Sequence, residues 1–382
     1  MRTEQGLVAH PGPATWVFRA GALAELPQIL ASREWRRVGV LHGERGWRAA
    51  RRLLPEPATW AVEVVDAPFG GECSPEEVGR VRDLVREQDL DAVVAVGGGK
   101  VMDTAKAAGL RAGDTPVVLV PTLASNCAAW ATISVLYRPD STPIGHEVHP
   151  HPADVVLVDP RVLADAPTEY LRAGIADTLA KWYECAGGLA AADGWDLSAG
   201  MARHAARMCR DLLTEHAEAA LVDAEAGVVS DDVRIVQQVV IQTAGLVGAF
   251  GGAYGRATAA HAVHDGLSAL PSLHDTLHGT KVAYGVLVQL ALEGRWTEVA
   301  DLDVLYPRLG LPRTLDQLGV VEPEADAVAT IARIAAAPGT TIHALPVPVA
   351  SADVERALRE LEEHERPTVD TTDHGAPRPT HH

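Results

Sequence analysis

Apolar runs separated by stretches with helical periodicity fill the first part of the chain. Residues 37–41, 60–65, 91–96 and 117–120 are compact apolar runs, and polar or glycine-containing segments bound each of them. Strands that alternate with helices pair in parallel, because each parallel connection needs a crossover. The pattern therefore predicts an N-terminal α/β domain built on a Rossmann-like, doubly wound parallel sheet.

Three shorter runs extend the predicted sheet. Residues 16–18 are expected as an edge strand, and residues 133–137 and 155–158 as further strands. The segment 146–152 between the last two is rich in turn formers and is expected to be irregular.

A helix start is predicted at residues 74–77, where the sequence reads Ser-Pro-Glu-Glu. Serine caps the free backbone N–H groups, proline suits the first turn, and the acids lie at the positive end of the helix dipole. The helix is expected to continue to about residue 87.

Beyond residue 160 the pattern changes to helical periodicity with few β-branched runs. We expect helices over residues 171–185, 197–215, 228–250 and 352–365. The predicted organisation is an α/β domain over 1–159, an all-α domain over 160–365, and a tail over 366–382. The tail lacks core-forming residues and is expected to be disordered.

Charge and composition narrow the functional classes. The 382 residues carry a formal net charge of −18, and 47% of them are hydrophobic. An acidic surface repels phosphate backbones and anionic lipids, which disfavours nucleic-acid and membrane partners. No apolar run approaches the ~20 residues of a membrane helix, and no secretory signal is recognised. The four cysteines are far apart and are expected as reduced thiols of a cytoplasmic protein.

Three glycines follow the third apolar run, in Gly97-Gly98-Gly99-Lys100. Glycines after a strand let the backbone approach a ligand, and the following helix N-terminus offers unpaired N–H groups. The segment therefore suits a diphosphate, although a plain strand-to-helix turn is the alternative. Small polar residues at 122–125 follow the next strand and are expected on the same rim of the sheet.

Histidines gather in the helical half. His261 and His264 are three residues apart and share a helical face, and His278 begins the next apolar stretch. Asp177 lies within apolar helical sequence, with Lys181 one turn further on. An aspartate and two histidines suit a divalent ion that polarises a substrate oxygen. Core or capping histidines and an ordinary Asp177–Lys181 ion pair are the alternatives.

Together these pieces resemble the metal-dependent polyol dehydrogenases of the iron-containing alcohol dehydrogenase family, within the dehydroquinate synthase-like superfamily. The resemblance extends over residues 16–365 and is carried by segments 97–103, 121–125, 174–177, 261–264 and 278–279. Within this family the sequence is similar to the glycerol dehydrogenase branch. Segments 127–130, 177–184 and 278–285 resemble the hydroxycarboxylate dehydrogenases, which reduce 2-oxo acids with a nicotinamide cofactor.

The resemblance implies roles for particular residues. It makes the α/β domain the NAD(P)-binding domain and the helical domain the one that binds metal and substrate. The implied metal ligands are Asp177, His261 and His278. The implied cofactor-binding residues are Gly98, Gly99, Lys100, Asp103, Thr122, Ser125, Ile133 and Val135. We also expect a homo-oligomer.

Two departures from the family bear on the chemistry. Lys181 stands where iron-dependent members have a fourth ligand, a histidine, so three protein ligands are expected. That shell suits Zn²⁺, with Fe²⁺, Ni²⁺ or Mn²⁺ as alternatives. Cys127 stands where glycerol dehydrogenases have an aspartate that meets the polyol. An aspartate would repel a substrate carboxylate by roughly 4 kcal/mol at ~4 Å, whereas a neutral thiol would not.

The expected reaction is hydride transfer between NAD or NADP and a small 2-oxo acid, with His264 passing the proton. Lys181 or Arg256 is expected to pair with the substrate carboxylate, and Cys127 to admit it, unless Cys127 only fills space. The alternatives are a glycerol or polyol dehydrogenase, a carbocycle-forming lyase and a catalytically silent relative. An acid that follows this strand can select NAD by binding the adenosine ribose, and Glu44 is a candidate for that acid. Glu44 can also point elsewhere, so both NAD and NADP stay possible.

Overall fold

The structure is a computed structural model that describes residues 9–139, 143–190, 197–252, 255 and 257–366. The chain divides into two compact units, Met1–Arg256 and Ala257–His382, which are described separately. Arg256 and residues 367–382, which include all but the first residue of the predicted tail, lie outside the described residues.

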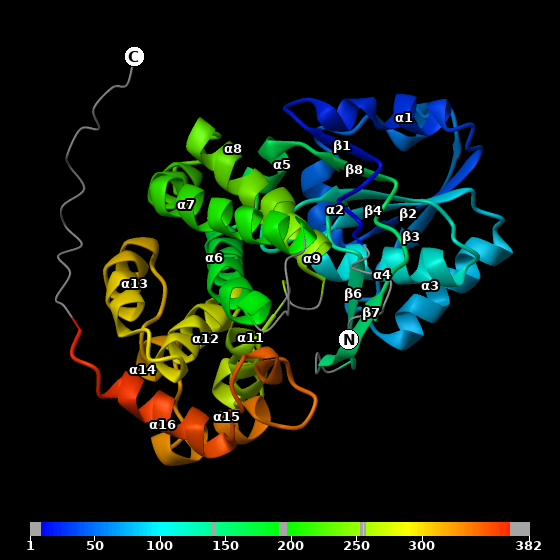
Figure 1. Ribbon diagram of the computed structural model, residues 1–382. Coiled ribbons are helices and arrows are strands. Elements are labelled where there is room, and N and C mark those ends of the chain that lie inside the picture. Colours follow the sequence, from blue (N-terminus) through cyan, green and yellow to red (C-terminus); the bar gives the residue numbers. More distant parts are fainter. Residues whose placement is uncertain (1–8, 140–142, 191–196, 253–254, 256, 367–382) are drawn as a thin grey trace. The chain divides into compact units, whose positions relative to one another are not determined.

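The first unit begins with alternating strands and helices (Figure 1). Its sheet elements are β1 (Thr15–Phe18), β2 (Arg37–His42), β3 (Glu63–Pro68), β4 (Ala92–Gly97), β5 (Val117–Pro121), β6 (Ile133–Tyr137), β7 (Pro143–Val148) and β8 (Val155–Val158). Between them lie η1 (Ala22–Glu25), α1 (Leu26–Ser32), α2 (Glu44–Ala50), η2 (Pro57–Thr59), α3 (Pro75–Glu87) and α4 (Gly99–Arg111).

Six strands form one sheet in the order β1-β8-β5-β4-β2-β3, and every pair in it is parallel. This confirms the predicted parallel sheet and the edge position of the first strand. After β2 the chain forms β3 on one side of β2 and then β4 on the other side of β2. Ligands of open parallel sheets bind at such a switch point, beyond the carboxyl ends of the strands.

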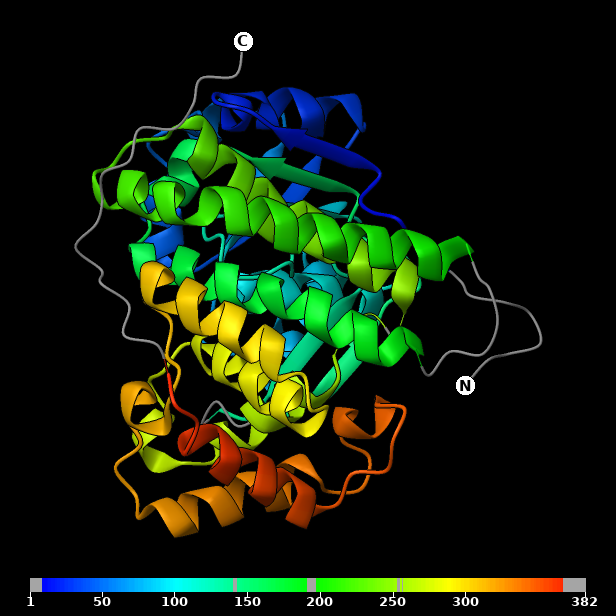
Figure 2. The ribbon, with the colours of Figure 1, turned by 60° about the vertical axis from the view of Figure 1, so that its left-hand side comes forward.

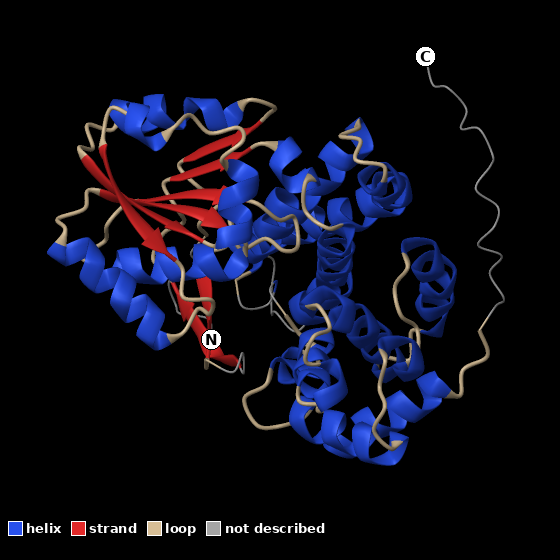
Figure 3. Cartoon of the chain, turned by 180° about the vertical axis from the view of Figure 1, so that it is seen from behind, coloured by secondary structure: helices blue, strands red, loops and turns tan. Residues whose placement is uncertain are grey.

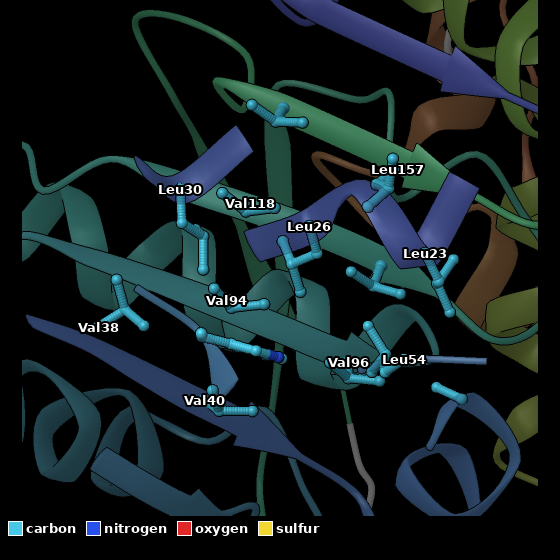
Figure 4. Packing of buried hydrophobic residues seen from close by; sticks show 14 of the residues in the cluster. Leu23, Leu26, Leu30, Val38, Val40, Leu54, Val94, Val96, Val118 and Leu157 are labelled. Carbon is cyan, nitrogen blue, oxygen red and sulfur yellow. The ribbon is translucent and has the colours of Figure 1, made fainter. Parts of the chain in front are cut away.

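The buried side chains of the sheet alternate between its two faces. Val38, Val40, Val94 and Val96 belong to one apolar cluster with residues of η1, α1 and α2 (Figure 4). Helix α1 covers this face of the sheet, and α3 and α4 lie on the other (Figures 1 and 3). β4 is buried along its whole length, as expected for a central strand covered on both faces.

The predicted helix start at Ser74 is confirmed. Ser74 lies in extended backbone, and its side chain accepts a hydrogen bond from the N–H of Glu77. Pro75 opens α3, and Glu76 and Glu77 lie in its first turn. The sequence therefore placed the start of this helix within one residue.

The segment between β6 and β8 differs from the prediction. Ile133–Tyr137 does not join the main sheet but pairs antiparallel with Pro143–Val148 in a separate hairpin. Residues 146–148, expected as a turn, therefore belong to strand β7. This strand is mostly exposed and carries Gly145 and His146, so it lacks the apolar run that marks a buried strand.

Helices follow β8 within the first unit. They are α5 (Pro160–Ala164), α6 (Thr168–Ala190), α7 (Leu197–Glu225), α8 (Asp231–Gln238), the π-helix η3 (Val239–Thr243) and α9 (Ala244–Gly251). Helices α6 and α7 run side by side (Figure 2). The change from strand to helix falls at the predicted position near 159/160. These helices nevertheless belong to the same compact unit as the sheet, and the assignment of 160–365 to a separate domain stays a prediction.

The helical stretch Asp231–Gly251 is the one described segment that is long and apolar enough to cross a membrane, by length and composition alone. Its mean hydropathy is 1.3, and 56% of the tested window is buried inside the structure. The expectation that no run approaches membrane length is wrong by this measure, because an average over the window tolerates its glutamines and threonine. A core helix passes the same test, so the segment is weak evidence for a membrane span.

The secondary-structure elements that the structure describes in the second unit are all helices. It comprises α11 (Ala259–Ser268), η4 (Pro271–Leu273), α12 (His278–Leu292), α13 (Trp296–Leu309), α14 (Leu315–Leu318), α15 (Glu324–Ala335), η5 (Thr341–Ala344) and α16 (Ser351–Glu362). Helix α16 packs against α12 and α15 (Figure 1). Its buried residues Val354, Ala357, Leu358 and Leu361 form a single apolar stripe at helical spacing.

Helix α6 approaches the loop after β5 very closely. A Cβ added at Gly174 would lie 2.1 Å from the carbonyl oxygen of Ala124 and 3.0 Å from the Cα of Ser125. Both atoms are backbone, so the clash cannot be relieved by rotating a side chain.

We expect Gly174→Ala to lower the free energy of unfolding by about 1–3 kcal/mol, the usual cost of overpacking. Chemical denaturation followed by circular dichroism measures this change. Gly79→Ala on α3 is the matched control, since nothing lies within 4 Å of an added Cβ there. That control should be neutral or stabilising by about 0.5–1 kcal/mol, because alanine is the better helix former. Equal stabilities for the two variants would contradict the close contact.

Candidate functional site

The glycine-rich turn lies at the switch point of the sheet. β4 ends at Gly97, Gly98 is the N-cap of α4, and the helix begins at Gly99. Gly98 supplies no side-chain cap, so the first-turn N–H groups are available to an anion. Neighbouring atoms leave little space for side chains: a Cβ on Gly98 would lie 2.9 Å from Leu123, and one on Gly99 would lie 3.0 Å from Asn126.

The loop after β5 lies against this turn, as predicted for two segments that follow neighbouring parallel strands. The N–H of Thr122 donates to the carbonyl oxygen of Gly97 at 3.1 Å, and Thr122 is buried. Ser125 follows in the same loop and is half-buried. Helix α2 also approaches, since a Cβ on Gly46 would lie 2.8 Å from the Thr122 Oγ1 and 3.2 Å from the Gly97 Cα. Thr122 therefore lies beside the triple glycine, as predicted, and its contact with the cofactor stays a prediction.

Lys100 is turned away from the glycines toward an acid. Its Nζ donates to Oε2 of Glu72 at 2.5 Å and lies 5.3 Å from the centre of the Tyr137 ring. A pocket of about 450 Å³ adjoins this pair and is lined by Gly70, Gly71, Glu72, Ser74, Glu76, Glu77, Arg80, Lys100 and Pro139. Glu72 and this pocket were not predicted from the sequence. The Gly70-Gly71-Glu72 segment after β3 was the available signal, because it follows another strand on the same rim.

Asp103 faces the interior of the first unit. Its Oδ2 accepts the N–H of Val135 at 3.0 Å, and its Oδ1 lies 2.9 Å from Nζ of Lys106. Burial raises the pKa of the Asp103 carboxyl, and Lys106 opposes that effect. The Lys106 ammonium also donates to the carbonyl oxygens of Ala128, Ala131 and Ile133. Asp103 therefore fixes strand β6, and its predicted contact with the cofactor stays a prediction.

A histidine completes this network behind β6. The Ser134 hydroxyl donates to the carbonyl oxygen of Asp103 at 2.7 Å, which uses its only proton. The Nε2 of His149 lies 2.8 Å from the same hydroxyl and must therefore donate to it. Burial, with help from the charge of Lys106, lowers the pKa of His149 to about 4. Ser134 lies between Ile133 and Val135, the two residues predicted beside the nicotinamide, so the network sets their position.

The residues that follow β2 pair with their neighbours. His42 lies 2.9 Å from Asp66 through its Nε2 and stacks on Trp47 with ring centres 4.7 Å apart. Glu44, the candidate selector for NAD, pairs with Arg48 at 2.6 Å. This arrangement leaves the choice between NAD and NADP to experiment.

Helix α6 carries buried charges close to a thiol. Asp177, Lys181 and Glu184 are buried in α6, and Cys127 is half-buried. Burial disfavours the Lys181 ammonium, but the negative charge of Asp177, added to smaller contributions from Glu184 and the neighbouring cysteines, outweighs it and raises the pKa of Lys181. Burial raises the pKa of Cys127, and Lys181 only partly offsets this. At neutral pH this region therefore holds a lysine cation beside a neutral thiol. Arg256, the alternative partner for a carboxylate, lies outside the described residues.

Trp130 anchors the segment that carries Cys127. Its indole Nε1 donates to the carbonyl oxygen of Pro11 at 2.9 Å. Its side chain also fills the space over two glycines, since a Cβ would lie 2.4 Å from the Trp130 side chain at Gly12 and at Gly245. The Cys127 segment is therefore held between the chain's first described residues and α9.

Three imidazoles cluster in the second unit, as predicted. His261 and His264 lie on α11, and His278 is the first residue of α12. The ring centres of His261 and His278 are 5.3 Å apart, and those of His264 and His278 are 4.2 Å apart. Burial lowers the pKa of His264 to about 3, with a further contribution from His278. His264 is therefore neutral at physiological pH.

The contact between α11 and α12 is made by backbone. A Cβ on Gly285 would lie 2.3 Å from the carbonyl oxygen of Ala260, the residue before His261. Gln289, one turn further along α12, accepts hydrogen bonds at its Oε1 from the N–H of Ala260 and the hydroxyl of Thr258, both at 3.0 Å. The two helices are therefore held at a set distance beside the histidines.

Comparison with known proteins places this arrangement in a known group. The model of the iron-containing alcohol dehydrogenase family matches residues 13–160. The chain is 36% identical to hydroxycarboxylate dehydrogenase A of Escherichia coli (strain K12) over 354 residues, 92% of this chain and 96% of that protein. It is 37% identical to a glycerol dehydrogenase of Thermotoga maritima over 309 residues, 80% of this chain and 83% of that protein. The crystal structure of a probable glycerol dehydrogenase from Sinorhizobium meliloti 1021 matches with a TM-score of 0.84 and 32% identity, covering 93% of this chain and 98% of that one.

The fold and these relatives define a dehydrogenase that acts on alcohol groups. Within that class, the chain belongs to the iron-containing alcohol dehydrogenase family. The predicted fold class, a parallel α/β part followed by helices, is confirmed.

The buried neutral His149 predicts a pH dependence of stability. Its pKa is about 4 in the folded chain, below the ordinary value of about 6.5. Between these values the unfolded chain binds a proton that the folded chain does not, so stability falls as the pH falls. The loss from pH 6.5 to 4 should be about 3 kcal/mol for this residue.

Urea denaturation at a series of pH values measures the effect, and His149→Gln should remove this part of the slope. The matched control is His146→Gln, which replaces an exposed imidazole on the neighbouring strand β7 and should leave the slope in place. Identical slopes for wild type and His149→Gln would contradict the assignment.

Proposed function

We propose that this enzyme transfers hydride between NAD(P)H and a small 2-oxo acid, and catalyses the reverse oxidation of a 2-hydroxy acid. The observation that carries the proposal is that the buried Lys181 of α6 lies close enough to the half-buried, free thiol of Cys127 for its charge to act on it. The relatives named hydroxycarboxylate and glycerol dehydrogenase supply the reaction class, and the charge in this region bears on the choice between their substrates.

The proposed metal ligands are Asp177, His261 and His278. A carboxylate oxygen and two imidazole nitrogens are donor types that divalent metals bind, and each residue offers one of them. His261 and His278 are held by two helices in backbone contact, which favours a fixed geometry. Three protein ligands suit Zn²⁺, with Fe²⁺, Ni²⁺ and Mn²⁺ as alternatives.

The proposed dinucleotide site is the rim at the switch point. The first-turn N–H groups of α4, beginning at Gly99, would receive the diphosphate, and glycine at 98 lets it approach. Thr122 and Ser125 border the same turn, and the network around Asp103 holds Ile133 and Val135 of β6 in position. In this assignment Lys100 adds positive charge after release from Glu72.

Bound groups would divide the chemistry between them: the metal ion supplies Lewis acidity to a substrate oxygen, and NAD(P)H supplies the hydride. The residues of the chain orient the substrate. Lys181 would pair with the substrate carboxylate, a charge-assisted contact that fixes one end of the molecule. The neutral Cys127 would leave that carboxylate without a repelling charge.

Polyol oxidation is the second candidate, favoured by the similarity to glycerol dehydrogenases. A diol carries no charge, so Lys181 would have no ionic partner in it. A panel of 2-oxo acids and polyols, each tried with NAD(H) and NADP(H), separates the two. Preference for glycerol over 2-oxobutanoate in the wild-type enzyme would overturn the proposal.

We expect Cys127→Asp to lower kcat/KM for 2-oxobutanoate by roughly 10- to 1,000-fold. The upper figure corresponds to the roughly 4 kcal/mol of repulsion between unit charges ~4 Å apart. Activity with glycerol should fall far less. Cys127→Ser, which stays neutral at nearly the same size, is the matched control and should keep the preference for the 2-oxo acid. Equal losses with both substrates would indicate that Cys127 only fills space.

Metal removal should abolish activity, and re-addition of Zn²⁺ or another divalent ion should restore it. Asp177→Asn and His261→Ala should each reduce the bound metal measured by elemental analysis. His274→Ala replaces an exposed histidine outside the proposed ligand set and should retain the metal. Full metal content in Asp177→Asn would remove that residue from the ligand set.

A further inference from the structure

A chain of hydrogen bonds runs from an acid on α11 to the first residue of α12. Nδ1 of His264 lies 3.1 Å from Oδ1 of Asp265, and Nε2 of His264 lies 2.9 Å from Nδ1 of His278. Ser268 adds its hydroxyl to the same His264 Nε2 at 3.2 Å. All four residues belong to the second unit. Asp265 was not singled out by its sequence, because an acid next to a histidine has no distinctive spacing.

The direction of each hydrogen bond follows from the acid. An ionised carboxylate only accepts, so Nδ1 of His264 carries the proton that it donates to Asp265. With that proton on Nδ1, the other ring nitrogen of the His264 imidazole, Nε2, carries the lone pair and accepts. Two groups face this lone pair, Nδ1 of His278 at 2.9 Å and the Ser268 hydroxyl at 3.2 Å, and the closer of them, Nδ1–H of His278, donates to it. A His278 ring that donates from Nδ1 has its lone pair on Nε2, which is the nitrogen that a metal ligand needs.

We propose that Asp265 and His264 are positioning residues that fix the tautomer and ring orientation of His278 for metal binding through Nε2. The inference rests on the proposed function only in that His278 is taken as a ligand. Metal-bound histidines commonly donate their second ring N–H to a carboxylate or carbonyl, and loss of such a partner weakens metal binding about 10- to 100-fold. Here one imidazole is inserted between the carboxylate and the ligand.

The packing of the two helices makes this chain rigid. His278 begins α12, and the backbone contact of Gly285 with Ala260 holds α12 against the helix that carries His264. The carboxamide of Gln289 fixes the start of α11 through Thr258 and Ala260. A hydrogen bond between rings on two locked helices has little freedom to change partner.

This role differs from the proton relay predicted for His264 from the sequence. A relay needs a ring nitrogen that exchanges a proton with the substrate or with solvent, whereas the partners of the two ring nitrogens of His264 are Asp265, Ser268 and His278. The relay predicts a changed pH profile of kcat with unchanged metal affinity. The positioning role predicts the reverse.

The test compares five variants of the full-length enzyme, two at Asp265, two at His264 and a control at Ser268. Asp265→Ala removes the acceptor that orients His264, and Asp265→Asn keeps an amide oxygen that can still accept from Nδ1–H. His264→Leu removes the acceptor for His278, and His264→Gln supplies a side-chain oxygen in its place. Ser268→Ala is the matched control, because it removes only the second donor to His264 Nε2.

Two measurements read out the result besides activity. Nitrogen-15 NMR of the metal-free enzyme, labelled on histidine, reports which ring nitrogen of His278 carries the proton. Competition with a chromophoric chelator gives the dissociation constant for Zn²⁺. We expect Nδ1–H on His278 in the wild type and a dissociation constant raised about 10- to 100-fold in Asp265→Ala and His264→Leu. Asp265→Asn and His264→Gln should lose less, and Ser268→Ala should match the wild type.

An Nε2–H tautomer of His278 in the metal-free wild type would overturn the inference, as would unchanged Zn²⁺ affinity in both Asp265→Ala and His264→Leu. A His264→Gln enzyme with normal metal affinity and an altered pH profile of kcat would support the relay instead. Failure of the proposed function is a separate result. In that case the wild type itself binds no Zn²⁺, while the NMR measurement still decides the hydrogen-bond chain.

Discussion

Close backbone contact between elements is the constraint on which the candidate site depends. Helix α6 lies so close to the loop after β5 that there is no room for a Cβ at Gly174. Helix α12 lies equally close to α11 at Gly285. Such contacts leave no room for adjustment by side-chain rotation, because the opposing atoms are carbonyl groups. In each unit they lie within a few residues of the proposed chemistry: Gly174 precedes Asp177 by one helical turn, and Ala260 adjoins His261.

Buried charge is handled by pairing at short sequence separation. Asp103 and Lys106 pair on α4, and Lys106 also takes three carbonyl oxygens, so the ammonium is satisfied without water. Asp177 and Lys181 are the corresponding residues on α6 and interact through their charges. The first pair is committed to structure, since it holds β6 in place. The second lies close enough to Cys127 for the Lys181 charge to act on that thiol, which is the basis of the substrate proposal.

Much of the fold followed from the sequence because the sheet is buried on both faces. Apolar runs rich in valine mark β4 and β5 directly, and Ser74 marks the start of α3 by capping chemistry. Strand β7 was missed because exposed residues such as His146 carry no periodic signal. The histidine cluster could be predicted from helical spacing, whereas the partners of its members could not. Glu72 contacts Lys100 from a segment 28 residues away, and Asp265 contacts the adjacent His264, so neither contact has a spacing that the sequence reveals. Only coordinates reveal that Asp103 points inward.

The π-helix Val239–Thr243 has a consequence for how this chain could vary. A π turn spans one more residue than an α turn, so it amounts to an insertion absorbed inside a continuous helix. Deleting one residue there would restore ordinary α winding and leave the phase of the helix after it nearly unchanged. Gly245 would then keep its place beside the Trp130 side chain. Loss of a single residue should therefore be tolerated better in this stretch than in an ordinary α-helix, where it would turn every later side chain to another face.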